Sequence, residues 1–141
     1  MRRDMLLEIF DVLRHDPYIS ERLDPQQDIT FNRYPEIESI TRPIIVIDEL
    51  DEPMEREYAD NDSLALSYLI QVDVFTKVQP GINARTLRDN LSDTILILLK
   101  EELGMTNVSS AKPEYDKDFK VYRSARRYEG TYYREDIIGG Q

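Results

Sequence analysis

The side chains that most often carry out catalysis are scarce in this sequence. Its 141 residues include no cysteine and a single histidine, His15. A thiolate nucleophile, a disulfide and a cysteine-bound zinc or iron–sulfur site are therefore excluded. One histidine without a cysteine also leaves no Cys-His pair, and no Ser-His-Asp arrangement can be recognised around it. Because His15 follows a predicted helix, where a cation complements the helix dipole, we interpret it as a capping residue.

Clustered carboxylates are the second group of side chains that could carry out chemistry. Residues 60–62, Asp-Asn-Asp, follow Asp48, Glu49 and Asp51, and such a cluster can hold Ca²⁺ or Mg²⁺. The spacing does not fit an EF-hand, because no glycine lies inside the segment and no glutamate closes it. No pair of carboxylates stands out for glycoside hydrolysis, and residues 80–83 hold too few glycines for a phosphate-binding loop. The sequence therefore predicts no catalytic residue, no metal site and no cofactor.

A segment rich in basic and aromatic residues, 120–134, is the third group of side chains that could carry out chemistry. Such a mixture can stack on single-stranded nucleic acid. The whole chain, however, has 18 Lys and Arg against 28 Asp and Glu, a formal charge of -10, which disfavours binding to a phosphate backbone. We interpret the segment as a strand with two different faces and predict no specific nucleic-acid binding.

The acidic block, residues 48–62, and the basic block, residues 120–134, carry opposite charge in one chain. Blocks of this kind can pair within one molecule. They can also pair head-to-tail between identical copies, which closes into a ring when the rotation allows. From the residues alone both arrangements remain open.

Four elements that must position these residues follow from hydrophobic periodicity. Residues 4–14 repeat apolar side chains at helical spacing, with Asp4 as the N-cap. Residues 43–50 contain a β-branched run typical of a buried strand, and residues 64–77 alternate as a strand with two faces. A long helix is predicted from the cap Asn83 to a terminating glycine, Gly104.

The remaining segments are less regular. Residues 16–41 contain three prolines and predict a loop with a short strand at 29–31. Residues 51–63 predict an exposed acidic loop, and residues 105–113 are polar without a clear period. Strands or a hairpin are expected around 119–128, with a bend or bulge at Gly130 and a flexible tail at 135–141.

Together these elements predict one domain over residues 1–141 with an α+β fold. We expect an antiparallel or mixed β-sheet with an N-terminal helix and one long helix packed on one face. The longest apolar run, residues 95–99, is far too short to span a bilayer, so no membrane partner is expected.

The order of these features resembles the small tail-completion and tail-terminator proteins of siphophages and prophages. The resemblance covers residues 4–130. It rests on the first helix, the Tyr34-Pro35-Glu36 element, the strand 43–47, the acidic loop, the strand ending at 68–75, the long helix and the terminal segment 122–130.

The resemblance implies a non-enzymatic virion protein at the head–tail interface, present in the host cytoplasm during assembly. Such proteins form a ring, usually a hexamer, that caps the tail tube, stops its growth and joins it to the head. The implied partners are further copies of the chain, the major tail tube protein and the neck or connector proteins. DNA passes through such a ring, and negative charge in its lumen would keep the DNA from sticking.

Within this resemblance the acidic loop corresponds to an extended loop that contacts a neighbouring subunit or the tube, and residues 122–128 correspond to a terminal β element. The candidate subunit-interface residues are Asp51, Glu52, Glu55, Glu57, Asp60, Asp62, Arg123, Arg126, Arg127 and Tyr128. Three alternatives remain: a head–tail connector or stopper protein of the neck, a small cytoplasmic protein-binding adaptor, and a hydrolase that uses the acidic cluster with a metal.

Overall fold

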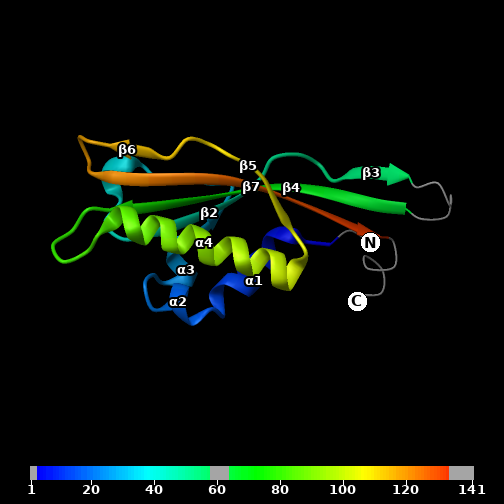
Figure 1. The fold of residues 1–141 in the computed structure, drawn as a ribbon, viewed down its shortest axis with the longest axis horizontal. Helices are drawn as coiled ribbons and strands as arrows, with labels where there is room; N and C mark the ends of the chain where they lie inside the picture. The colour runs from blue at the N-terminus through cyan, green and yellow to red at the C-terminus, as the bar shows by residue number, and fades with distance from the viewer. Residues whose placement is uncertain (1–2, 58–63, 134–141) are drawn as a thin grey trace.

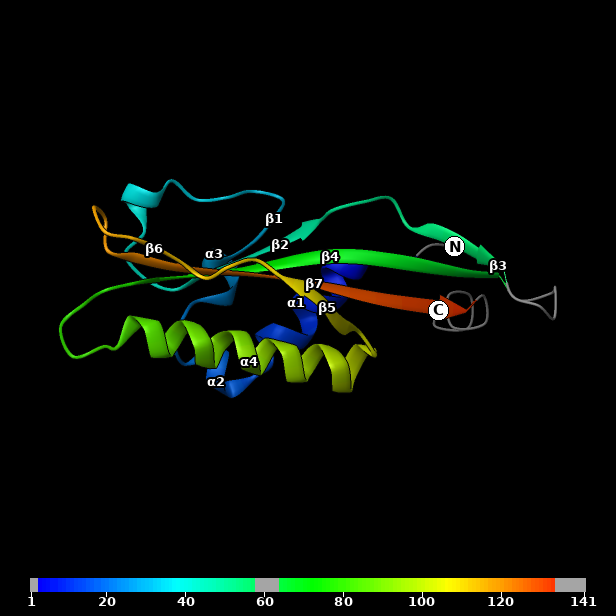
Figure 2. The same cartoon turned by 45° about the horizontal axis from the view of Figure 1, so that its top comes forward.

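Helices and strands are segregated to two layers in the computed structural model of the protein, which describes residues 3–57 and 64–133. Two longer helices, α1 and α4, lie on one face of a mixed sheet (Figures 1 and 2). The elements in chain order are α1 (Met5–Arg14), α2 (Pro17–Ser20), α3 (Pro25–Asp28), β1 (Ile29–Phe31), the 3-10 turn η1 (Ile37–Ser39), β2 (Ile44–Glu49), β3 (Met54–Glu57), β4 (Leu64–Lys77), α4 (Ala84–Leu103), β5 (Thr106–Ser110), β6 (Glu114–Asp116) and β7 (Val121–Tyr133).

The sheet is built around its two longest strands, β4 and β7. They pair antiparallel along their whole length, from Ala65 opposite Tyr133 to Lys77 opposite Val121. The strand order is β1-β2-β4-β7-β5, with β3 also beside β4 and β6 also beside β7. Only β1 and β2 pair in parallel among the described strands. The predicted α+β fold with a mixed sheet, an N-terminal helix and a long helix is confirmed.

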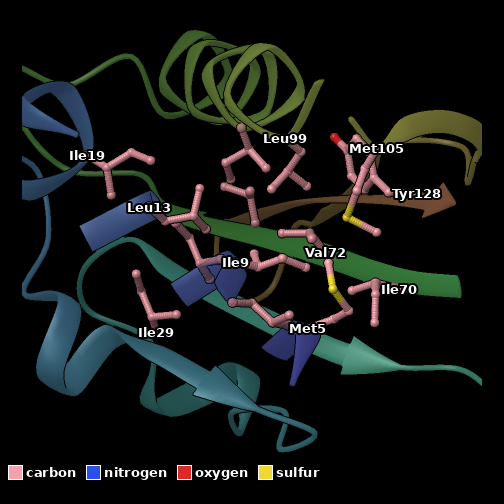
Figure 3. Packing of buried hydrophobic residues seen from close by; sticks show 14 of the residues in the cluster. Met5, Ile9, Leu13, Ile19, Ile29, Ile70, Val72, Leu99, Met105 and Tyr128 are labelled. Carbon is pink, nitrogen blue, oxygen red and sulfur yellow. The ribbon is translucent and has the colours of Figure 1, made fainter. Parts of the chain in front are cut away.

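The main core lies between the helices and the sheet (Figure 3). Alternate residues of β4 point to the helices, as the sequence pattern predicts, and meet apolar side chains from α1, α4 and β7. Full burial of one such side chain stabilises a fold by about 1.5–3 kcal/mol. The largest buried members include Met5, Ile9, Leu13, Ile70, Leu91, Ile95, Leu99 and Tyr128.

The ends of the two longer helices agree with the capping prediction. The Asp4 carboxylate accepts a hydrogen bond from the Leu7 amide at 3.2 Å, and the Asn83 side chain accepts one from Thr86 at 3.1 Å. Gly104 ends α4 in the left-handed conformation, with φ of 66°, which a glycine adopts without strain. These caps fix where α4 begins and ends against the sheet.

A second, smaller core lies on the opposite face of the sheet. It joins Ile40, Val46, Phe75 and Val121, with Ile37 packed against them. The predicted strand at 29–31 is confirmed as β1. The prediction that most of residues 16–41 form a loop is wrong at two places. Pro17 begins the short helix α2 and Pro25 begins the short helix α3, and each helix is capped by the preceding aspartate.

Two predicted irregular segments contain strands, which corrects the sequence interpretation. In the predicted acidic loop, β3 pairs with β4, and in the polar segment 105–113, β5 pairs with β7. Both β4 and β7 extend beyond their other neighbours, and the hydrogen-bonding groups along their edges require partners. A charged or polar sequence is compatible with an edge strand, because charges there prevent unwanted pairing. The predicted tail 135–141 lies outside the described residues.

Gly130 is neither a bend nor a bulge. It pairs with Tyr68 within the continuous strand β7, and the irregularity of register falls in β5, between Asn107 and Ser109. A Cβ atom at position 130 would lie 2.6 Å from the hydroxyl oxygen of Tyr132. The glycine is therefore required by the close approach of the Tyr132 ring on the same face of the strand.

Candidate subunit-interface residues

The guanidinium group of Arg123 binds a buried carboxylate on the sheet face opposite the helices. Its Nε and Nη2 atoms donate to Asp73 Oδ2 at 2.8 and 2.6 Å, and Nη1 lies 3.6 Å from Glu114. Asp73 has no exposed surface, so its charge depends on this cation and on the Gln71 amide, which donates to Oδ1 at 2.8 Å. Burial nevertheless raises the pKa of Asp73.

The same network ties an N-terminal segment to the sheet. The Tyr34 hydroxyl donates to Asp48 Oδ2 at 2.7 Å, and the Arg123 guanidinium lies over the Tyr34 ring at 5.6 Å. Burial, followed by the hydrogen bond to Asp48, raises the pKa of Tyr34. Arg123, a predicted interface residue, therefore has a structural role within its own copy.

The other basic candidates of β7 also bind within the molecule. Arg126 points to the helices, where Nη1 donates to Asp93 Oδ1 of α4 at 3.0 Å. The exposed Arg127 lies on the opposite face and donates from Nε to Gln71 Oε1 at 3.1 Å. The ion pairs of Arg123 and Arg126 therefore go to carboxylates outside the acidic block.

Tyr128, a predicted interface residue, is buried within its own copy. Its side chain is 1 % exposed and belongs to the main core, and burial raises its pKa to about 12. The sequence pattern conceals this, because an aromatic residue between arginines fits either face of a strand. The register with Ile70 of β4 places it on the helix side.

The acidic candidates lie at the edge of the sheet. Asp51 and Glu52 are exposed in the segment between β2 and β3, while Glu55 and Glu57 are in β3 itself. Asp60 and Asp62 lie outside the described residues. β3 extends beyond the end of α4 (Figures 1 and 2), and among the described strands it pairs only with β4. β3 is therefore displaced from the helical layer, and we call residues 49–57 the acidic edge.

The opposite end of the sheet carries a basic surface that the sequence analysis does not identify. We define this basic end as the exposed apolar residues Val78, Ile82 and Phe119 with the lysines Lys77, Lys117 and Lys120. The Val78 amide donates to the Lys120 carbonyl at 2.9 Å, and the Lys77 ammonium donates to the Phe119 carbonyl. Two segments about 40 residues apart meet here only through the register of β4 and β7.

His15 occupies the predicted capping position. It follows the last turn of α1, and its Nδ1 lies 2.8 Å from the Asp11 carbonyl oxygen. Because a carbonyl oxygen only accepts, Nδ1 carries the proton that is donated to the helix end. Within residues 3–57 and 64–133, no group of three or more His, Cys, Asp or Glu side chains is arranged to hold a metal ion.

Comparison with known proteins adds no relative: no family model matches the chain, and no curated protein matches it either. In the part of the chain that the structure describes, no helix has the length and apolar character needed to cross a membrane. What the protein does must therefore be inferred from its own residues and fold.

Proposed function

We propose that the protein is a structural subunit of a phage or prophage virion. Identical copies assemble head-to-tail into a hexameric ring at the head–tail interface. The ring caps the tail tube, ends its growth and joins it to the neck. This function needs self-association and two further protein contacts, and it needs no cofactor.

The observation that carries the proposal is the acidic edge. β3 is an edge strand beyond the helical layer, and the exposed Asp51 and Glu52 precede it. An edge strand offers unpaired backbone groups to another chain, and its charges select which chain can approach. The ion pairs of Arg123 and Arg126 go to carboxylates of the same copy outside the acidic block, which favours another basic surface as the partner of the acidic edge.

The fold supports the resemblance on which the proposal draws. The first helix α1, the strands β2 and β4, the long helix α4 and the terminal strand β7 follow one another in the expected order. The formal charge of -10 suits a ring through which DNA passes, because an anionic lumen repels the phosphate backbone.

The direct test is the assembly of tail tubes. The major tail tube protein of the same phage is polymerised with and without this protein, and tube lengths are measured by electron microscopy. We expect shorter tubes of narrow length distribution, with a ring at one end. Unchanged tube lengths and bare tube ends would refute a role in termination.

A further inference from the structure

We propose that the basic end of one copy is the surface that binds the acidic edge of the next copy. This inference rests on the proposed ring, and it specifies which surfaces make the contact. It also replaces the β7 arginines, the candidates that the sequence suggests, with residues at the turn before β7 and at the end of β4.

The basic end has the composition of a protein-binding surface. Val78, Ile82 and Phe119 are 38 to 44 % exposed, and Lys77, Lys117 and Lys120 stand within two residues of Val78 or Phe119 in the two segments that meet there. Apolar contacts at the centre with charges at the rim are typical of specific interfaces. The rim charges determine which partner is attracted and in what orientation.

The turn at this end also contains two carboxylates, Asp116 and Asp118, and Asp116 is already hydrogen-bonded within the turn. Asp116 Oδ1 accepts hydrogen bonds from the amides of Asp118 and Phe119, both at 3.0 Å, and so holds the turn together. Arg85 is exposed in the first turn of α4, and the carbonyl of the preceding Ala84 accepts a hydrogen bond from Thr76, near the end of β4, at 2.7 Å. Cations therefore outnumber carboxylates at the basic end.

The acidic edge is complementary in both charge and polarity. Glu49, Asp51 and Glu52 are exposed there, and the side chain of Met54 beside them is 61 % exposed. An apolar side chain among carboxylates matches an apolar cluster among lysines. A second copy of this chain therefore supplies the chemistry that the basic end requires.

The two surfaces cannot meet within one copy. Met54 lies opposite Ser67 of β4, whereas the basic end lies at Lys77 of the same strand. Ten residues of strand span about 33 Å at ~3.3 Å per residue. A contact between these ends is therefore heterologous and joins copies in series, which closes into a ring when the rotation allows.

The backbone conformation of Lys120 makes this residue a favourable place to remove a charge from the basic end. Its φ is 56°, in the left-handed region where glycine and asparagine are favoured. A lysine there costs backbone strain that a glycine would avoid. Because Lys120 closes the turn at residues 117–120, a glycine in its place would preserve the turn.

This strain provides a clean test, because Lys120→Gly removes the charge and relaxes the backbone at once. The full-length chain is prepared as the wild type, as Lys117→Gln/Lys120→Gly, and as the control Lys100→Gln, which removes an exposed lysine from α4. Sedimentation equilibrium measures the association constant of each. We expect at least tenfold weaker association for the basic-end variant, with a melting temperature equal to or above that of the wild type, and no change for the control.

A charge exchange identifies the partner surface. Lys117→Glu/Lys120→Glu and Glu49→Lys/Asp51→Lys should each fail to associate alone, and an equimolar mixture should form mixed contacts. Wild-type rings that resist every basic-end substitution would overturn this inference and leave the proposed function standing. A wild type that remains monomeric at every concentration would overturn both.

Discussion

At the scale of single residues, the Asp73–Arg123 ion pair is the interaction in the sheet whose loss we expect to cost stability. Asp73 is fully buried, while about a third of the Arg123 side chain is exposed. Burying a carboxylate costs free energy, which the pairing cation and the Gln71 amide offset. The pair fastens β7 to β4 and, through Tyr34, holds the segment before η1 against the sheet.

We predict that Arg123→Ala destabilises the fold, because it leaves Asp73 buried without its cation. The expected loss is about 2 kcal/mol, below the ~3–5 kcal/mol of a fully buried pair, because water already screens part of Arg123. Denaturant unfolding measures the loss. Lys112→Ala, at an exposed lysine between β5 and β6, serves as the control and should change stability by less than about 0.5 kcal/mol.

The pH dependence of this loss follows from the raised pKa of Asp73. A carboxyl with a higher pKa in the folded state stabilises the fold at low pH, and that contribution is lost as the pH rises through the folded pKa. Without Arg123 the ionised form has lost its main partner. The deficit of Arg123→Ala should therefore be smallest near pH 4 and widen toward pH 7. A deficit independent of pH would contradict a buried charge at Asp73.

At the scale of elements, the strength of the periodic signal determines which elements the sequence predicts. The helix α1, the strands β2 and β4 and the helix α4 have repeats long enough to show their period, and α4 has a cap at each end. The edge strands β3 and β5 have polar sequences, and they form because β4 and β7 offer unpaired edges. The four-residue helices α2 and α3 are too short for a period to appear.

The continuity of β7 gives a prediction at this scale. Gly130→Ala would push the new Cβ against Tyr132, whose hydroxyl donates to the Leu103 carbonyl at 2.6 Å and whose ring lies under Arg3. The ring cannot move without losing these contacts, so we expect a loss of about 1–3 kcal/mol in thermal or denaturant unfolding. An unchanged or raised stability would show that a flexible Tyr132 had made room.

At the scale of the whole molecule, the important feature is the separation of charge along one long sheet. The sequence identifies the acidic block correctly as a charged and exposed segment, at least at Asp51 and Glu52. It does not identify the basic end, because β4 and the turn before β7 come together only when the strand register is known. It also assigns Tyr128 to the surface, because local sequence does not determine which face of a strand is covered.

Self-association through charged surfaces is most directly tested by the solution mass of the purified protein. Light scattering is recorded over a range of concentrations at about 0.05 M and 1 M salt, since the screening length falls to about 3 Å at 1 M. We predict a species of about six copies at low salt, formed on concentration, that dissociates at high salt. The mass of a single chain at every concentration and both salt levels would contradict the proposed ring.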